Sequence, residues 1–372
     1  RDRSPSRGLG DVYKRQAGNR SAMDSFGLFM RYMNDEYKPL PSSIIAEGID
    51  CFGVAGDRGD VAMVGYGAAR YALASGNCNE AEKLWPLIEW CLEYCHRQLN
   101  ADGVVKSDSD ELENRFPAGK ANLCTSSLYY DALVSAAYLG KALKKEHKQI
   151  KSYQDRAAEL YKNIDAYFAR NVEGYDTYRY YDGNTVLRSW ICIPLTMGIY
   201  DQAKGTVEAL FSDKLWMENG LLTQSGTSTY WDRSTLYAFR GAYSCGARDI
   251  ATEYLDKYSA TRLLGDHVPY AVEAWPEGNQ RHLSTESALY CRIMTEGLFG
   301  IRPIALDAFM MTPQLPESWN TMSLKRICAF GSIFDIEVKR DKDDKLLVLI
   351  KKDHKIVKRS KITNGKPIEV RI

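Results

Sequence analysis

The sequence predicts a mainly α-helical chain whose helices pair into hairpins, followed by a small antiparallel β module. Three observations lead to this fold class. Apolar residues recur at helical spacing in segments that come two by two, with a short turn inside each pair. Longer loops rich in acidic and aromatic residues separate the pairs. After Pro303 the pattern changes to the alternation of apolar and charged residues that is typical of strands.

The amino-acid composition argues against several classes of function. The chain has 372 residues, enough for one large domain and a small one. Its formal net charge of +1 gives no general attraction to nucleic acid or to an anionic membrane, and it contains no apolar run long enough for a membrane span, so neither is an expected partner. The 9 cysteines and 5 histidines show no metal-ligand spacing. We expect free buried thiols, no metal and no cofactor.

Residues 1–16, which read RDRSPSRGLGDVYKRQ, have no amphipathic period. They resemble a translated adaptor read of the kind found at the ends of metagenome-derived reading frames. We therefore expect a non-native or disordered leader over 1–16 and a natural protein that begins upstream, so that a signal peptide would be lost from this chain. A short helix is predicted from about Ser21 to Tyr37.

The first two helical pairs follow acidic loops. The Gly-rich loop 43–60 carries four acids and leads into a helix from Val61 to Ser75, where Asp60 is placed to cap the first turn. The partner helix, Glu80 to Leu99, has its predicted buried face marked by Trp85, Ile88, Leu92 and Cys95. A second acidic loop, 100–122, precedes the next pair, Leu128 to Leu143 and Tyr153 to Arg170.

A small hairpin is predicted over Tyr175 to Tyr181 with Asp182-Gly183, after which the helical pattern resumes. The remaining predicted helices are 188–200, 202–210, 231–245, 247–258 and 287–299. About ten helices in five hairpins are expected. In a closed ring of hairpins, the acidic and aromatic loops on alternate connections would all fall on one face.

The last part of the chain reads as strands. Phe334, Ile336 and Val338 alternate with charged residues, as in a strand with one buried face. A second strand, Leu346 to Ile350, follows an acidic turn, and a final strand to Ile372 follows Asn364-Gly365. The lysine excess over 339–366 is interpreted as a solvated strand face, because no aromatic platform for nucleic acid is interleaved with it.

One stretch has the composition of a sugar-cleaving site. Glu273 and Glu277 flank Trp275 in a segment that Pro276 and Gly278 keep from being helical, just before a helix start near Ser284. Sugar rings stack on indoles while carboxyl groups act on the glycosidic oxygen and on a water. The plain alternative is a surface turn with solvated acids.

The order of these features resembles the six-hairpin (α/α)6 glycosidases. The motifs are Trp231-Asp232 before one inner helix and Val-Glu-Ala-Trp-Pro-Glu-Gly (272–278) before the last. Two branches look closest: glucosidase-I or mannosylglycerate-hydrolase-like enzymes, and α-L-rhamnosidase-like enzymes. Segments 298–303 and 309–319 are similar to the junction between barrel and sandwich in those families.

The resemblance implies a domain division and a location. A catalytic (α/α)6 toroid would cover 17–302, incomplete at its N-terminus because a whole ring needs twelve helices, and a β-sandwich module would cover 303–372. The resemblance further implies a periplasmic or secreted protein.

The resemblance also implies two catalytic positions. Glu273 matches the general base of both branches. Glu113, in Glu-Asn-Arg-Phe-Pro (113–117), takes the place of the general acid of the glucosidase-I-like branch, with Glu for Asp. Asp110, Glu111 and the 47–60 loop stay open as alternatives for the acid. A rhamnosidase-like acid would lie in that earlier loop, which lacks the expected Arg-x-Glu-Arg run.

These matches predict an exo-acting, inverting glycoside hydrolase with a carbohydrate substrate, its two carboxyl groups roughly 6.5–9.5 Å apart. The candidate substrate-binding residues are Trp231, Asp232, Trp275, Glu277, Asp57, Arg58 and Arg115. Each has a structural alternative: Trp231 in the core, Asp232 as a helix-start acid, or ion pairs within each acidic loop. The alternative functions are a disaccharide phosphorylase, a polysaccharide lyase and a non-catalytic glycan-binding relative.

Overall fold

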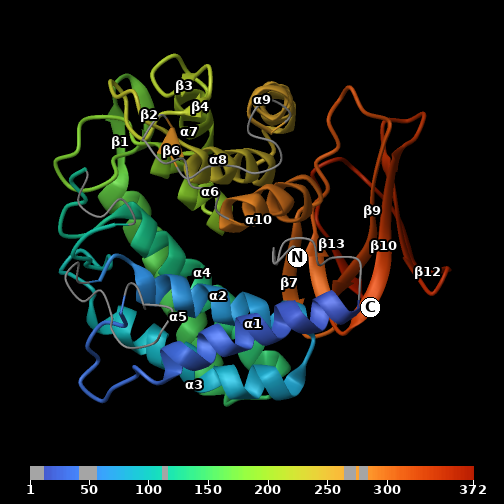
Figure 1. Cartoon of the computed structure of the whole chain (residues 1–372), viewed down its shortest axis with the longest axis horizontal. Coiled ribbons are helices and arrows are strands. Elements are labelled where there is room, and N and C mark those ends of the chain that lie inside the picture. Colours follow the sequence, from blue (N-terminus) through green and yellow to red (C-terminus); the bar gives the residue numbers. More distant parts are fainter. Residues whose placement is uncertain (1–11, 42–56, 111–115, 264–273, 276–283) are drawn as a thin grey trace.

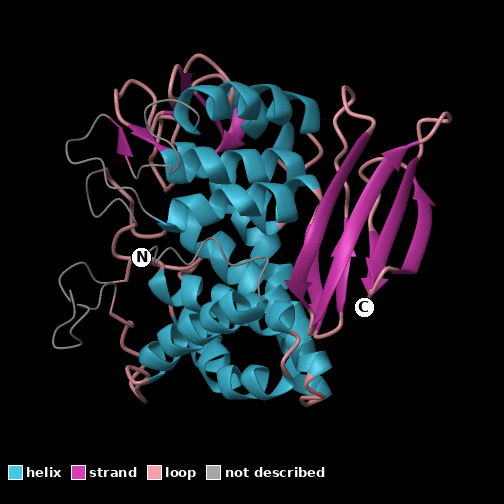
Figure 2. Ribbon diagram, turned by 45° about the vertical axis from the view of Figure 1, so that its right-hand side comes forward, coloured by secondary structure: helices cyan, strands magenta, loops and turns pink. Residues whose placement is uncertain are grey.

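The computed structural model describes residues 12–41, 57–110, 116–263, 274–275 and 284–372. Its helices form one body and its long strands stand beside them as two antiparallel sheets (Figure 1; Figure 2). Among the helices described, none is both long and apolar enough to cross a membrane. The mainly α fold with a C-terminal antiparallel β module, predicted from periodicity, is confirmed in these outlines.

The helices come largely in consecutive pairs, as the sequence predicts. The first helix runs earlier than expected, over Val12–Met30 instead of 21–37. The bounds of the others are α2 Asp60–Ser75, α3 Cys78–Arg97, α4 Leu123–Ala142, α5 His147–Phe168, α6 Ile193–Met197, α7 Ala203–Leu210, α8 Asp232–Ser244, α9 Arg248–Tyr258 and α10 Ser284–Arg292. A 3-10 turn, η2 (Ser189–Cys192), precedes α6, and two π-helical turns, η3 (Ser259–Leu263) and η4 (Ile293–Leu298), extend α9 and α10.

Five helices form an inner layer. Helix α2 packs on α4, α4 on α6, α6 on α8 and α8 on α10. Each even-numbered helix thus contacts the next even-numbered helix along the chain. Small residues permit this close approach: a Cβ added at Gly241 of α8 would lie 2.8 Å from the Cβ of Leu195 on α6. On the outer helix α3, Trp85, Ile88 and Leu92 are buried, which confirms the predicted stripe.

The start of α2 differs from the prediction that Asp60 caps it. Gly59 is the N-cap residue, in a left-handed conformation (φ 91°), and Asp60 is already the first helical residue. The Asp57 carboxylate accepts the N–H groups of Gly59 (2.8 Å) and Asp60 (3.0 Å) instead. The prediction that Asp60 caps the helix was wrong. The left-handed conformation of Gly59 brings the carboxylate of Asp57, instead of that of Asp60, to the first N–H groups of the helix.

The first hairpin lies a few residues earlier than predicted. Strands β1 (Ala169–Val172) and β2 (Tyr175–Tyr178) pair around Glu173-Gly174. Both turn residues have positive φ, 50° and 96°, which matches the twist of a tight hairpin. The sequence pattern places residues 169–170 in the preceding helix, so strand β1 was not predicted.

The C-terminal strands form two sheets (Figure 2). The four-stranded sheet has the order β12-β11-β10-β9, and the three-stranded sheet has the order β13-β8-β7. Phe309 of one sheet stacks on Phe330 and Phe334 of the other at 5.0 and 5.6 Å between ring centroids, so the two sheets face each other across an aromatic core. The strand bounds are β7 Ile301–Ala305, β8 Ala308–Met311, β9 Thr321–Ala329, β10 Ser332–Arg340, β11 Leu346–Lys352, β12 Lys355–Ile362 and β13 Ile368–Arg371.

The sheets lie against the C-terminal end of the inner helix α2. Phe330 N donates to Ala74 O (2.7 Å) and Gly331 N to Ser75 O (3.2 Å), so the β9–β10 turn continues the hydrogen bonding of α2. Strand β7 also contacts α2 and α4. The opposite ends of the inner helices, where the acidic loops enter, therefore point away from the sheets.

Candidate active site

The predicted catalytic loops are described only in part. Glu273, Glu277, Glu113 and Arg115 lie outside the described residues. Trp275 belongs to strand β6 (Ala274–Trp275), which pairs antiparallel with β5 (Tyr230–Trp231). Trp275 stands opposite Tyr230, and Ala274 stands opposite Trp231. This pairing holds β6 beside the first residue of α8.

Asp57 joins two of the acidic loops. Its N–H donates to the Asp108 carboxylate (2.8 Å), and its carbonyl accepts the Asp108 N–H (2.8 Å). The side chain is 3% exposed. Burial raises the pKa of Asp57 to about 6, although hydrogen bonds from Tyr94 and from the start of α2 act in the opposite direction. A carboxyl group with such a pKa exchanges its proton near neutral pH.

Arg58 lies next to Asp60, with Nε 3.6 Å from the carboxylate, and both side chains are largely buried. Asp57, Arg58 and Asp60 therefore form a compact group. Hydrogen bonds and an ion pair inside the loop account for the contacts between these three residues. Such contacts are what the alternative of an ion pair within the acidic loop predicts. Sugar binding by Asp57 and Arg58 stays a prediction.

The loop before α4 is fixed by a buried ion pair. Arg188 Nη2 lies 3.3 Å from the Asp110 carboxylate, and both side chains are almost fully withdrawn from solvent. Arg188 also donates to Pro117 O (2.9 Å), and its guanidinium lies over the Phe116 ring at 5.1 Å and the Tyr180 ring at 4.7 Å. Burial, followed by the charge of Asp110, raises the pKa of the Tyr180 phenol well above its usual value.

Trp231 and Asp232 lie at the start of α8. Trp231 is 3% exposed among the described residues, and it meets Trp190 edge to face at 4.6 Å. The Arg233 guanidinium lies 5.4 Å from the Trp231 ring centroid. Asp232 is buried against Arg262 (3.1 Å), which also donates to Asn219 O (2.9 Å). Trp231 is thus packed against its neighbours and largely buried. Its role as a sugar platform stays a prediction. The role of Asp232 as a ligand of sugar hydroxyl groups also stays a prediction.

These contacts run in sequence around the N-terminal ends of four inner helices. Asp57 reaches the loop before α4, Asp110 reaches Arg188 before α6, and Trp190 reaches Trp231 before α8. Helix N-termini carry partial positive charge, which favours carboxylates there. Within the part of the chain that is described, no group of three or more His, Cys, Asp or Glu side chains could hold a metal ion. This end of the inner helices suits a polyhydroxylated ligand and acid–base chemistry by carboxyl groups.

A second charged cluster, which the sequence did not reveal, lies between the inner helices. Glu296 of η4 pairs with Arg70 (2.7 Å), Arg240 (2.9 Å) and Arg292 (2.5 Å). Desolvation raises the pKa of Glu296, but the three arginines outweigh it and hold the pKa well below its usual range. In the sequence these residues are single charges on separate helices, so no local pattern could have linked them.

Asp131 of α4 completes this cluster, since it pairs with Arg70 (2.9 Å) and with Arg302 of β7 (2.5 Å). Burial raises the pKa of Asp131, whereas Arg302 and Arg70 lower it further, to about 2. The cluster therefore connects α2, α4, α8, the end of α10 and β7. We call these six residues, Arg70, Asp131, Arg240, Arg292, Glu296 and Arg302, the floor cluster.

Comparison with known proteins places the fold. No family model matches the chain, and no curated protein sequence matches it. Among solved structures, a sialidase matches with a TM-score of 0.64 and 13% identity, over 87% of this chain and 34% of its own. A wild-type glycosidase matches with a TM-score of 0.58 and 13% identity, over 78% of this chain and 85% of its own.

An α-L-rhamnosidase from Dictyoglumus thermophilum matches with a TM-score of 0.57 and 12% identity, over 88% of this chain and 37% of its own. At such identities the likeness is one of fold. The resemblance to ring-shaped α/α glycosidases that the sequence predicts is thereby confirmed for the fold. The chain spans about one third of the length of the sialidase and of the rhamnosidase.

Proposed function

We propose that the chain is a glycoside hydrolase that removes a terminal sugar from an oligosaccharide or a polysaccharide side chain. The observation that carries the proposal is the gathering of buried carboxylates and aromatic rings at the N-terminal ends of successive inner helices. The fold is shared with a sialidase and a rhamnosidase. In this proposal the inner and outer helices belong to a six-hairpin (α/α)6 toroid.

Glu273 is the proposed general base. It is covalently bonded to Ala274, and the pairing of Ala274 with Trp231 at the start of α8 supports a base on this side of the ring. The base must be ionised so that it can take a proton from the attacking water.

Glu113 is the proposed general acid, and it must keep its proton near neutral pH. It lies in the sequence between Asp110, which is buried against Arg188, and Phe116, which packs on the same guanidinium. Low polarity and nearby carboxylates raise the pKa of such a group. Asp57 is an example in the neighbouring loop, with a pKa of about 6. Among the alternatives, Asp57 has the pKa of an acid, whereas Asp110 is held by a guanidinium.

The remaining predicted residues would hold the sugar. Trp231 and Trp275 would provide apolar faces for the ring, while the acids Asp232, Glu277 and Asp57 and the cations Arg58 and Arg115 would bind hydroxyl groups. For inversion, acid and base stand roughly 6.5–9.5 Å apart, so that a water fits between the base and the anomeric carbon. The acid protonates the leaving oxygen as this water attacks the opposite face.

The test is hydrolysis of a panel of aryl glycosides and natural oligosaccharides in phosphate-free buffer. Wild-type protein should release a monosaccharide, and Glu273→Gln and Glu113→Gln should each lower the rate by about 10²–10⁴-fold. Glu93→Gln, in a solvent-exposed ion pair on the outer helix α3, is the matched control and should keep full activity.

Three results would count against parts of the proposal. Turnover that requires phosphate would mean phosphorolysis, and unsaturated products that absorb in the ultraviolet would mean a lyase. Full activity of Glu113→Gln would move the acid to another carboxylate. Amide replacements of Asp110, Glu111 and the four acids of the 47–60 loop would then identify which.

A further inference from the structure

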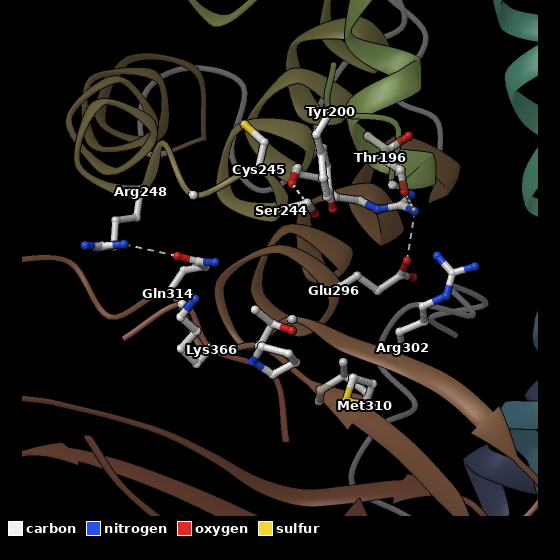
Figure 3. Close-up of a pocket in the computed structure, with 18 of the residues that line it drawn as sticks. Thr196, Tyr200, Ser244, Cys245, Arg248, Glu296, Arg302, Met310, Gln314 and Lys366 are labelled. Carbon is white, nitrogen blue, oxygen red and sulfur yellow. Dashed lines mark hydrogen bonds and ion pairs between the residues drawn. The ribbon is translucent and has the colours of Figure 1, made fainter. Parts of the chain in front are cut away.

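A cavity lies at the opposite end of the inner helices from the proposed active site, between their C-terminal ends and the β-sheets. It has a volume of about 560 Å³. Its walls include Tyr200 after α6, Ser244 and Cys245 at the end of α8, and Met310 of β8 (Figure 3). The cavity is therefore built jointly by the ring and the β module.

The lining of this cavity is strongly cationic. Five of its residues carry a positive charge, namely Arg70, Arg240, Arg248, Arg302 and Lys366. Glu296 is the one acidic residue among the described residues that line it. The other polar lining groups, such as Ser244, Gln314 and Asn364, are neutral hydrogen-bonding side chains.

The floor cluster does not balance this charge. It contains four arginines, Arg70, Arg240, Arg292 and Arg302, against two carboxylates, Asp131 and Glu296. Every arginine has a carboxylate neighbour, but the two carboxylates are shared among four guanidinium groups, so the net charge of +2 favours an anion at this place.

Two further observations point the same way. Arg240 is 1% exposed, and its Nη1 has no hydrogen-bond partner among the described residues. Tyr66 of α2 accepts hydrogen bonds from Arg240 (3.1 Å) and Arg292 (2.5 Å). Burial raises the pKa of this phenol, but Arg240, Arg292 and Arg70 outweigh it and lower the pKa below its usual value. The surroundings thus favour negative charge even on a tyrosine.

The mouth of the cavity holds the other two cations. Arg248 Nη1 donates to Gln314 Oε1 (3.3 Å), and Lys366 is exposed and has no carboxylate partner within the described chain. Figure 3 shows Arg248, Gln314 and Lys366 on one side of the cavity and Glu296 with Arg302 on the other. An anion in the cavity would therefore meet donors from both sides.

We propose that this cavity binds a small polar molecule that carries a phosphate or sulfate group. A tetrahedral oxyanion has enough oxygen atoms to accept hydrogen bonds from several guanidinium groups at once. The cavity is larger than one such group needs. Tyr200, Ser244, Gln314 and Asn364 would contact the remainder of the ligand, which suits the hydroxyl groups of a sugar ester.

The site is separate from the proposed catalytic end. Arg240 follows Asp232 by eight residues in α8, which corresponds to roughly 12 Å along a helix axis. A phosphate held by Arg240 would not reach a sugar bound at the N-terminal ends of the helices. The ligand would instead neutralise the floor cluster and stabilise the contact between ring and sheets.

Calorimetric titration of the full chain at constant ionic strength tests the proposal. The probes are inorganic phosphate, inorganic sulfate, glucose 6-phosphate and glucose 6-sulfate, with glucose as the uncharged comparison. We expect saturable binding of the anionic probes at one site and none of glucose. The double variant Arg248→Gln/Lys366→Gln should weaken binding by at least about tenfold, since it removes two charge-assisted donors.

The matched control is Lys358→Gln/Arg359→Gln on the exposed strand β12, which removes the same two charges at another surface. Its affinity should equal that of the wild type. Thermal unfolding without ligand confirms that both double variants are folded.

The absence of saturable binding for all four anions would overturn the proposal, as would equal weakening in both double variants. Equal affinity for inorganic and sugar-linked anions would keep the oxyanion site and overturn the sugar contacts. Because the readout is binding, none of these results depends on glycosidase activity.

Discussion

Replacement of Asp57 by Asn tests the electrostatics of the proposed catalytic end. Asn keeps an oxygen that can accept the N–H groups of Gly59 and Asp60, which Asp57 Oδ1 now accepts at 2.8 and 3.0 Å. It removes the charge and turns the second carboxylate oxygen into an amide NH2 group. The part of the effect that changes with pH therefore reports the cost of ionising a carboxyl group that is almost completely buried.

The size of the effect follows from the pKa. Burial raises the pKa of Asp57 from 3.8 to about 6. A carboxyl group whose pKa is higher in the folded protein binds its proton more tightly there, so its contribution to stability is complete at low pH and is lost as the pH rises through about 6. A shift of about two units corresponds to about 3 kcal/mol.

Urea unfolding at a series of pH values measures this contribution. Relative to the wild type, Asp57→Asn should gain up to about 3 kcal/mol of stability between about pH 4 and pH 8. Asp102→Asn, on an exposed turn before α4, is the control and should show no such gain. A difference between Asp57→Asn and wild type that does not change with pH, or that changes with the opposite sign, would refute the reasoning.

Two further predictions concern stability. Glu296→Gln should lower the free energy of unfolding by about 3 kcal/mol in urea titrations near neutral pH, because it leaves three arginines without their shared carboxylate. The control Glu93→Gln should lower it by at most about 1 kcal/mol. Equal losses in the two variants would contradict this prediction. Because the pKa of Glu296 is lowered, its contribution is present above its ordinary pKa and should fade in acid. Gly76→Ala should cost more than about 2 kcal/mol by the same measurement, since the residue has φ 68° and its Cβ would lie 2.2 Å from Gly331 N. Gly246→Ala, with φ 94° and open space around the Cβ, should show only the backbone cost of about 1–2 kcal/mol, and a similar loss in both variants would argue against a close contact between α2 and the sheets.

The sequence was sufficient for features that depend on local periodicity. The stripe of Trp85, Ile88 and Leu92 identified the buried face of α3, and the alternation from Phe334 to Val338 identified β10, whose inward residues are buried. In both cases one face of the element meets the core, so the spacing in the sequence repeats the spacing in space.

Features set by distant contacts could not be predicted in this way. The cap of α2 depends on the backbone conformation of Gly59, and the floor cluster depends on residues up to 226 positions apart, such as Arg70 and Glu296. Arg188 and Arg262 likewise gave no signal, because their partners Asp110 and Asp232 lie on other loops and helices. Ion pairs of this kind have no sequence period.

The proposed mechanism is that the loops at the N-terminal ends of the inner helices hydrolyse a glycosidic bond with inversion. Proton magnetic resonance of a reacting aryl glycoside in phosphate-free buffer tests it most directly, because the anomeric signal of the first product is visible before mutarotation. We expect the free sugar to appear first as the anomer opposite to that of the substrate, and we expect this signal to be lost in Glu273→Gln. First appearance of the same anomer as the substrate, or of the inverted anomer at an unchanged rate in Glu273→Gln, would contradict it.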